Sequence, residues 1–278
     1  MAGLEEVAEA LSRVGLEGVL CLEEEDPQYH AVKHVAGRLG PGAAALLGAL
    51  NALVSYRLAM RGEEWWWCWA RTVSSGPVGS VEEAVRREEE FLLSCRGSIV
   101  GREAKLRRLR RALAARDVLA RLLADPRSVL PSGIWLTGGL ARALGAREWS
   151  KTIVFAAKIA YYAARTIAGR VPAPWDVDIP VDVRVACFLY STGAVRAGSY
   201  RDLVRRPRPA QEAVRSLAIK SGIPPLNLDT IFWRLGWIPR DLPPEEWERA
   251  TSSITARCFP GSVLSGLFKR PCSGARYM

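Results

Sequence analysis

Residues 133–184 read GIWLTGGLARALGAREWSKTIVFAAKIAYYAARTIAGRVPAPWDVDIPVDVR, and this stretch decides the fold of the chain. Apolar residues recur at helical spacing on both sides of the sequence GARE at 145–148, which predicts two helices joined by a tight turn. A loop rich in glycine and proline follows the second helix and leads to Asp182. The stretch 133–184 is therefore expected to deliver one aspartate beside a pair of helices.

The second of these helices is expected to begin at Lys151. Ser150 belongs to the residue types that cap helix N-termini, and it would place Lys151 in the first turn, beside unpaired N–H groups. An extra positive charge is disfavoured there, and exclusion of water would act in the same direction. Both effects favour a neutral amine, which is a nucleophile for an electrophilic carbon. Lys151 is therefore the candidate nucleophile.

Lys151 shares one face of its helix with further cations and aromatic rings. This row continues through Phe155, Lys158, Tyr162 and Arg165, which are spaced three or four residues apart. For any one of these residues, a solvated edge with half-buried rings is the simpler interpretation. The row as a whole alternates charge with aromatic rings, which is unlike a core stripe.

Helical spacing also dominates the rest of the chain, and the alternation typical of strands is almost absent. We therefore predict an all-α protein in which residues 1–278 form one unit of two packed helical subdomains. At 278 residues and 49% hydrophobic content, the chain is long enough to bury a substantial core. Further helices are expected at residues 4–14, 27–39, 41–58, 63–73, 81–95, 102–124 and 227–237.

The charge of the chain points to a polyanionic partner. The formal net charge is +10, and because residues 1–26 are acidic, the remainder is more basic still. The segment 102–121 predicts an amphipathic basic helix, for which a solvated face and a contact to backbone phosphates are equally good interpretations. No apolar run is long enough to span a bilayer and no signal peptide is recognisable, so we expect a soluble intracellular protein.

Metal chemistry is not expected. The six cysteines contain no CxxC pair, and His30 and His34 lack a third ligand nearby. Whether Cys258 and Cys272 pair with each other stays open, and the tail after Trp247 suggests no chemistry. A run of four tryptophans stands out, because indoles at these positions surround nearly a full helical turn and cannot all face one core. The run consists of Trp65, Trp66, Trp67 and Trp69.

Taken together, these elements resemble the helix-hairpin-helix DNA glycosylase superfamily. LARALGAREWSK corresponds to the hairpin and lysine, GRVPAPW to the loop, and IPVDV to the aspartate. The segments DPQ, KTIVFAAKIAYYA and LDTIFW are more particularly similar to the archaeal 8-oxoguanine DNA glycosylase group, over roughly residues 22–237. The chain departs from the wider superfamily in its GARE turn, in Arg184 where many relatives have histidine, and in its longer lysine-to-aspartate interval.

The resemblance implies a base-excision glycosylase with AP lyase activity. Lys151 would attack C1′ of an extruded nucleotide, and Asp182 would stabilise the developing positive charge at the sugar and help to activate the amine. The resulting Schiff base would permit β-elimination on the 3′ side. The implied active site lies in a cleft between the two subdomains, and the enzyme is expected to act as a monomer, without a cofactor, on chromosomal DNA.

The resemblance also assigns binding residues, each of which has a physical rationale. Asp229 can accept a hydrogen bond from N7–H of 8-oxoguanine, although a main-chain carbonyl would serve as well, and Gln28 suits the Watson–Crick edge. The hairpin amides around Gly145 and Arg147 would hold a backbone phosphate. The implied base pocket consists of Gln28, Trp66, Phe155, Lys158, Asp229 and Trp233.

Two other functions remain compatible with the residues alone. A non-enzymatic helix-hairpin-helix protein could hold DNA or RNA through the hairpin and the basic helices, and would need neither Lys151 nor Asp182. A glycosylase for an alkylated base or an oxidised pyrimidine would use the same two residues, because a list of pocket residues does not fix the lesion.

Overall fold

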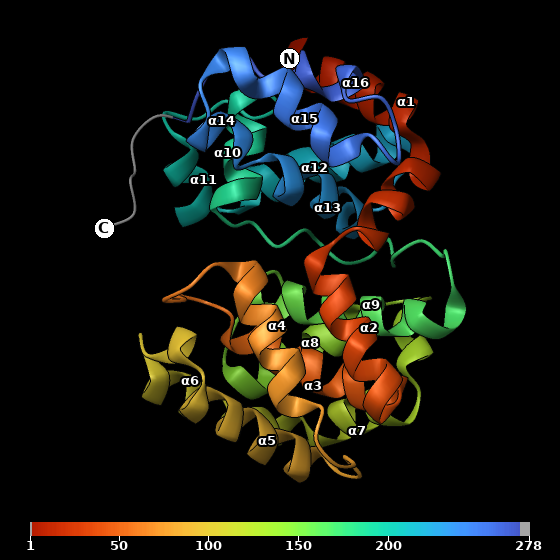
Figure 1. The fold of residues 1–278 in the computed structure, drawn as a ribbon, viewed down its shortest axis with the longest axis vertical. Helices are drawn as coiled ribbons and strands as arrows, with labels where there is room; N and C mark the ends of the chain where they lie inside the picture. Colours follow the sequence, from red (N-terminus) through yellow and green to blue (C-terminus); the bar gives the residue numbers. More distant parts are fainter. Residues whose placement is uncertain (1, 273–278) are drawn as a thin grey trace. The chain divides into compact units, whose positions relative to one another are not determined.

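The computed structural model describes residues 2–272, and the chain forms two compact units, each built from helices (Figure 1). The central unit spans Glu25–Val177, and the split unit combines the residues up to Glu24 with those from Asp178 onward. The described residues contain α-helices and short 3-10 helices but no β-strand, which confirms the all-α prediction.

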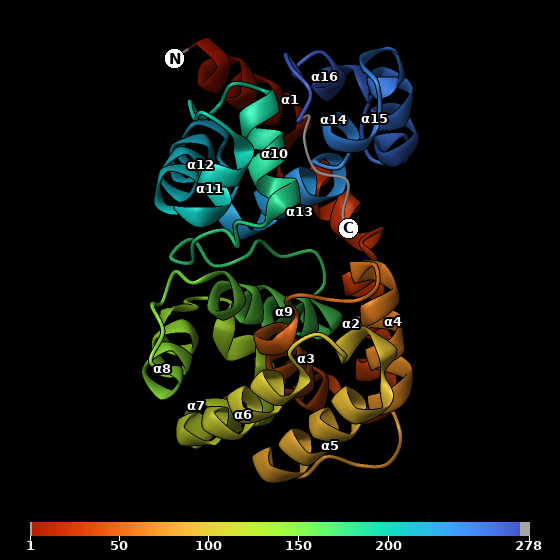
Figure 2. The same cartoon turned by 90° about the vertical axis from the view of Figure 1, so that its left-hand side faces the viewer.

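The central unit is organised around α3 (Pro41–Val54), whose residues from Ala43 to Val54 are all buried. A helix that is apolar on every side must be surrounded by other elements. Gly48 permits the close approach of α9 (Figure 2), because a Cβ there would lie 2.6 Å from Cγ2 of Ile159. The other helices of this unit are α2 (Pro27–Leu39), α4 (Gly62–Val73), α5 (Val81–Ser94), η1 (Arg96–Ser98), α6 (Arg102–Ala112), η2 (Leu113–Ala115), α7 (Arg116–Ala124), η3 (Pro126–Val129), α8 (Ile134–Leu144) and α9 (Lys151–Ala168).

The split unit packs α1 (Ala2–Glu24) against helices from the far end of the sequence. Gly15 interrupts the helical backbone of α1 with a φ of 66°, a value that glycine adopts without strain. The rings of Phe188 and Phe232 lie 4.6 Å apart in the core of this unit. Its other helices are α10 (Val183–Ser191), α11 (Tyr200–Arg205), α12 (Arg208–Ser221), α13 (Pro225–Leu235), α14 (Ile238–Asp241), η4 (Pro244–Glu246), α15 (Trp247–Thr255) and α16 (Ser262–Ser265).

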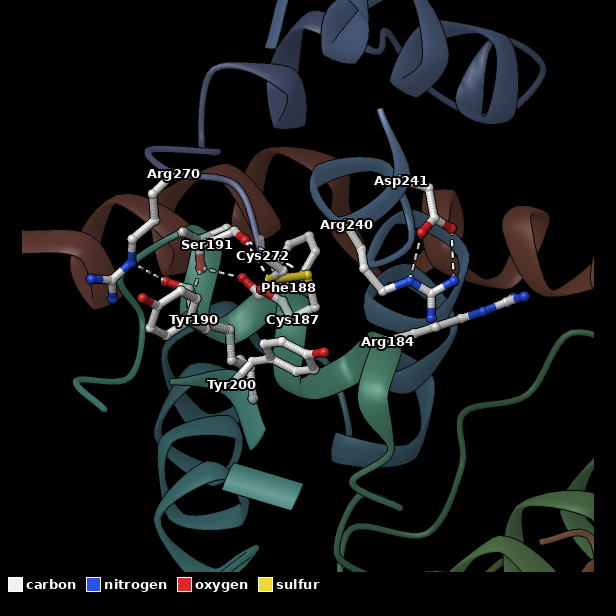
Figure 3. Close-up of a disulfide and its surroundings, with 12 residues drawn as sticks. Arg184, Cys187, Phe188, Tyr190, Ser191, Tyr200, Arg240, Asp241, Arg270 and Cys272 are labelled. Carbon is white, nitrogen blue, oxygen red and sulfur yellow. Dashed lines mark hydrogen bonds and ion pairs between the residues drawn. A yellow bond between two sulfur atoms is a disulfide. The ribbon is translucent and has the colours of Figure 1, made fainter. Parts of the chain in front are cut away.

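Two disulfides attach the C-terminal segment to earlier parts of the split unit. Cys258 and Cys272 do not pair with each other: Cys258 is bonded to Cys21 of α1, and Cys272 to Cys187 of α10. Figure 3 shows the second bond, with the guanidinium of Arg270 donating to a backbone carbonyl of α10. The sequence suggested no chemistry for the segment after Trp247. In the structure, this segment holds α10 in place through a disulfide and a hydrogen bond.

Two helix predictions need correction. The helix expected at 41–58 ends at Val54, and the helix expected at 102–124 is divided by the 3-10 segment Leu113–Ala115. Leu109 and Leu119, on either side of that segment, are both fully buried. In an unbroken α-helix, residues ten positions apart would point about 80° away from each other. The 3-10 turn therefore changes the rotation of the chain between the two helices, so that Leu109 and Leu119 both point into the core.

Candidate active site

The turn between α8 and α9 follows from a left-handed glycine. Gly145 adopts a φ of 60° and ends α8, with its N–H 3.3 Å from the carbonyl of Arg142. The N–H of Ala146 donates to the carbonyl of Ala141 at 2.9 Å. These bonds use the last carbonyls of α8, and α9 then begins at Lys151, as the sequence predicted.

The backbone N–H groups that remain available lie after the glycine. The N–H of Gly145 is engaged within the turn, whereas those of Arg147 and Glu148 donate to no acceptor in the part of the chain that the structure describes. Ser150 occupies the N-cap position of α9, but its side chain makes no capping bond. The turn before α9 thus presents open donors, which suit an anion.

Lys151 is the first residue of α9 and is half-buried. Its ammonium group forms no ion pair and no hydrogen bond with any of the described residues. The guanidinium of Arg108 donates to the hydroxyl of the next residue, Thr152, at 2.9 Å. An uncommitted amine at a helix N-terminus, with a second cation alongside, is a suitable arrangement for a nucleophile.

The row of residues that continues from Lys151 along α9 is buried, which excludes the solvated edge considered from the sequence. Lys158 and Tyr162 are 0% exposed, and Phe155 is 9% exposed. The ammonium group of Lys158 lies 5.3 Å from the centre of the Tyr162 ring, and the ring of Phe155 meets that of Trp66 edge-on at 5.7 Å. Cations and rings are thus buried along this face of α9, where they form two separate contacts.

The tryptophans of α4 differ in what their indole N–H groups do. Trp65 donates to Asn51 at 3.0 Å, and Trp69 donates to Glu88 at 2.6 Å. Burial raises the pKa of Glu88 well above its ordinary value, and the Trp69 bond opposes this shift. Trp66 is 1% exposed, yet its N–H donates to no acceptor among residues 2–272. Of these three buried indoles, Trp66 has its donor left for a ligand.

Gln28 lies in the first turn of α2, where its backbone N–H donates to Asp26 at 2.8 Å. Its side chain is 4% exposed, and Oε1 has no hydrogen-bond partner among the described residues. A buried polar atom without a partner costs about 1–3 kcal/mol, so such atoms are uncommon in folded proteins. Gln28 therefore presents an acceptor that a bound molecule can satisfy.

Asp182 is the N-cap of α10 and lies in the split unit. Its Oδ1 accepts hydrogen bonds from the N–H groups of Arg184 at 2.9 Å and Val185 at 3.0 Å. No hydrogen bond to Oδ2 occurs within residues 2–272. One oxygen of the carboxylate therefore holds the helix, while the other is available for a reacting group.

Asp229 and Trp233 lie one turn apart on α13 and are 2% and 8% exposed. The guanidinium of Arg184 lies 4.2 Å from the centre of the Trp233 ring, so a cation from α10 occupies one face of the indole. The sequence had marked Arg184 only as a departure from the superfamily pattern. The start of α13 is anchored by the amide of Asn227, which donates to the buried Glu23 at 2.8 Å.

The basic segments are partly committed to contacts within the protein. Arg110 pairs with Glu89 at 2.6 Å. Lys105 is fully buried with its amine 5.3 Å from the Trp65 ring, and burial lowers its pKa to about 8. Arg111 donates to the last carbonyl of α8 at 2.8 Å. Arg107 remains largely exposed, so it is the better probe for contact with DNA.

Within each unit, the structure brings predicted site residues together. The central unit joins Trp66 to Phe155, and it links Gln28 of α2 to Lys158 of α9 through contacts of Asp26 and Tyr162. The split unit joins the start of α10 to Trp233 through Arg184. No group of three or more His, Cys, Asp or Glu side chains suited to a metal ion occurs in the described part of the chain.

Comparisons with known proteins identify the family of the chain. The model of the AGOG family, described as N-glycosylase/DNA lyase, matches residues 8–259. A curated N-glycosylase/DNA lyase from Aeropyrum pernix is 47% identical over 98% of this chain and 96% of its own length. One from Pyrobaculum aerophilum is 38% identical over 84% of this chain and 86% of its own length. The crystal structure of the Pyrobaculum aerophilum 8-oxoguanine DNA glycosylase complexed with 8-oxoguanosine matches with a TM-score of 0.76 and 32% identity, covering 98% of this chain and 97% of that one.

Proposed function

The chain belongs to the AGOG family of N-glycosylase/DNA lyases, and we propose that Lys151 and Asp182 carry out its reaction on 8-oxoguanine in DNA. Membership of this family makes the chain an enzyme, which decides against a non-enzymatic DNA-binding protein. The complex with 8-oxoguanosine in a related structure favours 8-oxoguanine over an alkylated base or an oxidised pyrimidine. The observation that carries the residue assignment is the uncommitted amine of Lys151 at the first position of α9.

Lys151 is the nucleophile of this proposal. Its neutral amine attacks C1′ of the extruded nucleotide, the bond from C1′ to N9 breaks, and the base leaves with the bonding electrons. Loss of a proton from the new secondary amine and opening of the sugar ring give a Schiff base. Removal of a proton from C2′ then expels the 3′ phosphate, which cleaves the strand by β-elimination.

Asp182 supports this reaction electrostatically. Bond breaking at C1′ develops positive charge on the sugar, and a fixed carboxylate oxygen lowers the free energy of that state. Oδ2 suits this role because Oδ1 already accepts both capping bonds of α10, which hold the carboxylate in one orientation. The same oxygen can accept a proton as the Lys151 amine is activated.

The base is held by groups that stack and groups that hydrogen-bond. Phe155 and Trp233 supply aromatic surface, and Lys158 supplies positive charge for the oxygen atoms of the base. The unsatisfied Oε1 of Gln28 accepts from the Watson–Crick edge, and the indole N–H of Trp66 donates. Asp229 accepts from N7–H, the hydrogen that distinguishes 8-oxoguanine from guanine.

The DNA backbone is held at the turn before α9. The open N–H groups of Arg147 and Glu148 bind a phosphate, while Gly145 provides the left-handed backbone that exposes them. The enzyme acts on this DNA as a monomer inside the cell. No helix among the described residues has the length and apolarity needed to cross a membrane.

Borohydride trapping tests the proposal. DNA containing 8-oxoguanine is incubated with the enzyme and reductant, beside DNA carrying an alkylated purine or an oxidised pyrimidine. A covalent adduct on the first substrate, absent in Lys151→Gln, is the expected result. Strong trapping on the other lesions alone would overturn the substrate, and trapping by Lys151→Gln would overturn the nucleophile.

A further inference from the structure

A buried carboxylate connects two of the helices of the central unit that bear proposed base contacts, α2 and α9. Asp26 is 0% exposed and caps α2, with Oδ1 accepting from the N–H of Gln28 at 2.8 Å. Its other oxygen, Oδ2, accepts from the hydroxyl of Tyr162 at 2.9 Å. Tyr162 lies on α9, one turn after Lys158. Asp26 therefore links the helix carrying Gln28 to the helix carrying Lys158.

From this geometry we propose that Asp26 and Tyr162 are positioning residues for recognition of the base. The inference rests on the proposed function. A hydrogen bond to a charged group is stronger and more directional than one between neutral groups, so the two bonds of Asp26 fix the start of α2 against the middle of α9. Gln28 follows Asp26 by two residues, so the bonds that hold Asp26 also limit the movement of the unsatisfied Oε1 of Gln28.

The ring of Tyr162 adds a second constraint on the same group of side chains. It lies 5.3 Å from the ammonium group of Lys158 and contacts the ring of Tyr29 edge-on at 5.5 Å. A hydroxyl held by Asp26 prevents the Tyr162 ring from moving within this cluster. Loss of that bond would let Lys158 and Gln28 shift relative to each other, and recognition is sensitive to errors of about 1 Å.

Two substitutions separate the bond from the rest of the structure. Tyr162→Phe removes the hydroxyl and keeps both the ring and the helix cap. Asp26→Ser keeps a side chain that can cap α2, but its single oxygen does not reach Tyr162. Tyr161→Phe is the matched control: its hydroxyl lies on the same helix and donates to the carbonyl of Val171 at 2.9 Å, away from Asp26.

The readout compares two activities of one enzyme. Excision of 8-oxoguanine requires recognition of the base, whereas nicking of DNA with a preformed abasic site uses Lys151 without a base. Under single-turnover conditions, Tyr162→Phe and Asp26→Ser are expected to slow excision about tenfold and weaken binding of the damaged strand. Both should nick abasic DNA at the wild-type rate, and Tyr161→Phe should do so without loss of excision.

A double-mutant comparison identifies the path of the effect. In a Gln28→Ala background, Tyr162→Phe should cause much less than its tenfold loss, because the positioned group is already absent. Equal loss of excision and nicking in Tyr162→Phe, or no loss of either, would overturn the proposal. If the wild type nicks abasic DNA but does not release 8-oxoguanine, the proposed substrate is wrong. The proposed role of Asp26 in recognising that base is then wrong as well.

A separate observation concerns the cysteines of the central unit. Cys68 of α4 and Cys95 at the end of α5 are thiols, and their sulfur atoms lie 2.9 Å apart. A disulfide bond measures about 2.05 Å, so closure needs a movement of less than about 1 Å. We infer that this pair forms a third disulfide with a small-molecule disulfide as oxidant. Two thiol protons and two electrons are lost, the oxidant's S–S bond breaks, and two small thiols are released.

The thiol chemistry suits a slow structural bond more than a rapid sensor. Burial raises the pKa of Cys68 to about 11, which leaves little reactive thiolate at neutral pH. After incubation with oxidised glutathione, mass spectrometry should find a linked peptide containing Cys68 and Cys95, and the midpoint of thermal unfolding should rise by on the order of 5 °C. Cys68→Ser should show neither change. Alkylation of both thiols after that incubation, or a glutathione adduct on each, would overturn the inference.

Discussion

Asp182 combines a structural and a proposed chemical role, and a series of three substitutions separates them. Oδ1 caps α10 by accepting from the N–H groups of Arg184 and Val185, while Oδ2 makes no hydrogen bond with the described residues. Asp182→Asn keeps a capping oxygen of the same geometry and removes the charge. Asp182→Ser keeps a cap without a carboxylate, and Asp182→Ala removes both.

The magnitudes follow from these contacts. Asparagine and serine cap helices about as well as aspartate, so their cost in the free energy of unfolding should stay below about 0.5 kcal/mol. Alanine loses the cap and should cost about 1 kcal/mol, which corresponds to roughly 2–4 °C in a chain of this size. All three lose the charge that stabilises the sugar cation, so each should slow base excision about 10²–10³-fold.

The assay measures single-turnover excision of 8-oxoguanine and thermal unfolding on the same preparations. The expected pattern is a large loss of rate in all three variants and a loss of stability in Asp182→Ala alone. A rate that follows stability, with Asp182→Asn near wild type, would show that the residue is only a helix cap. Rates near wild type in every variant would refute the chemical role outright.

Four further predictions concern other parts of the chain. Lys151→Gln should bind damaged duplex but give no borohydride-trapped adduct, and an adduct from this variant would assign the nucleophile elsewhere. Trp233→Ala should weaken binding of single strands containing 8-oxoguanine or guanine alike, by about 1–3 kcal/mol in a fluorescence titration, since stacking does not distinguish them; unequal losses would contradict a pure stacking role. Arg107→Glu should make the affinity for DNA less dependent on salt concentration, seen as a flatter plot of log affinity against log salt. An unchanged slope would mean that α6 faces away from DNA. Arg111 is unsuitable as a probe because it donates to the last carbonyl of α8. Burial holds the pKa of Lys105 at about 8 in the folded chain, against an ordinary value of 10.5. The unfolded chain therefore binds more protons between these values, so Lys105 should add up to about 3 kcal/mol to the free energy of unfolding as pH rises through this range. Urea unfolding of Lys105→Met should lack this rise, and identical pH profiles would contradict it.

The sequence predicted the elements that depend on local signals. The start of α2 was readable because Asp26 and Pro27 are a capping residue and a first-turn proline, and the end of α8 because Gly145 tolerates a left-handed backbone. The division between α6 and α7 was not readable, because no proline or glycine marks it. It arises from the need to bury leucines on both sides, which is a property of the assembled core.

The candidate site was predictable as a list of residues, but the contacts that give those residues their properties were not. Spacing placed Lys158 and Tyr162 on one face, yet it did not show that this face is buried. Gln28 and Tyr162 are far apart in the sequence, and their shared partner Asp26 was visible only as a helix cap. Similarly, the sequence showed Arg184 only as a departure from the superfamily pattern. The structure placed its guanidinium over the Trp233 ring.

The two proposed catalytic groups lie at the starts of two different helices, and one property of the backbone makes this position suitable for both. Lys151 is the first residue of α9, and Asp182 is the N-cap of α10. The N-terminus of a helix carries partial positive charge, which interacts favourably with a carboxylate and unfavourably with an ammonium ion. The reaction requires a charged carboxylate to stabilise the sugar cation and a neutral amine to attack it. A helix start therefore suits both groups for opposite reasons: it stabilises the charged form of Asp182 and disfavours an ammonium ion at Lys151.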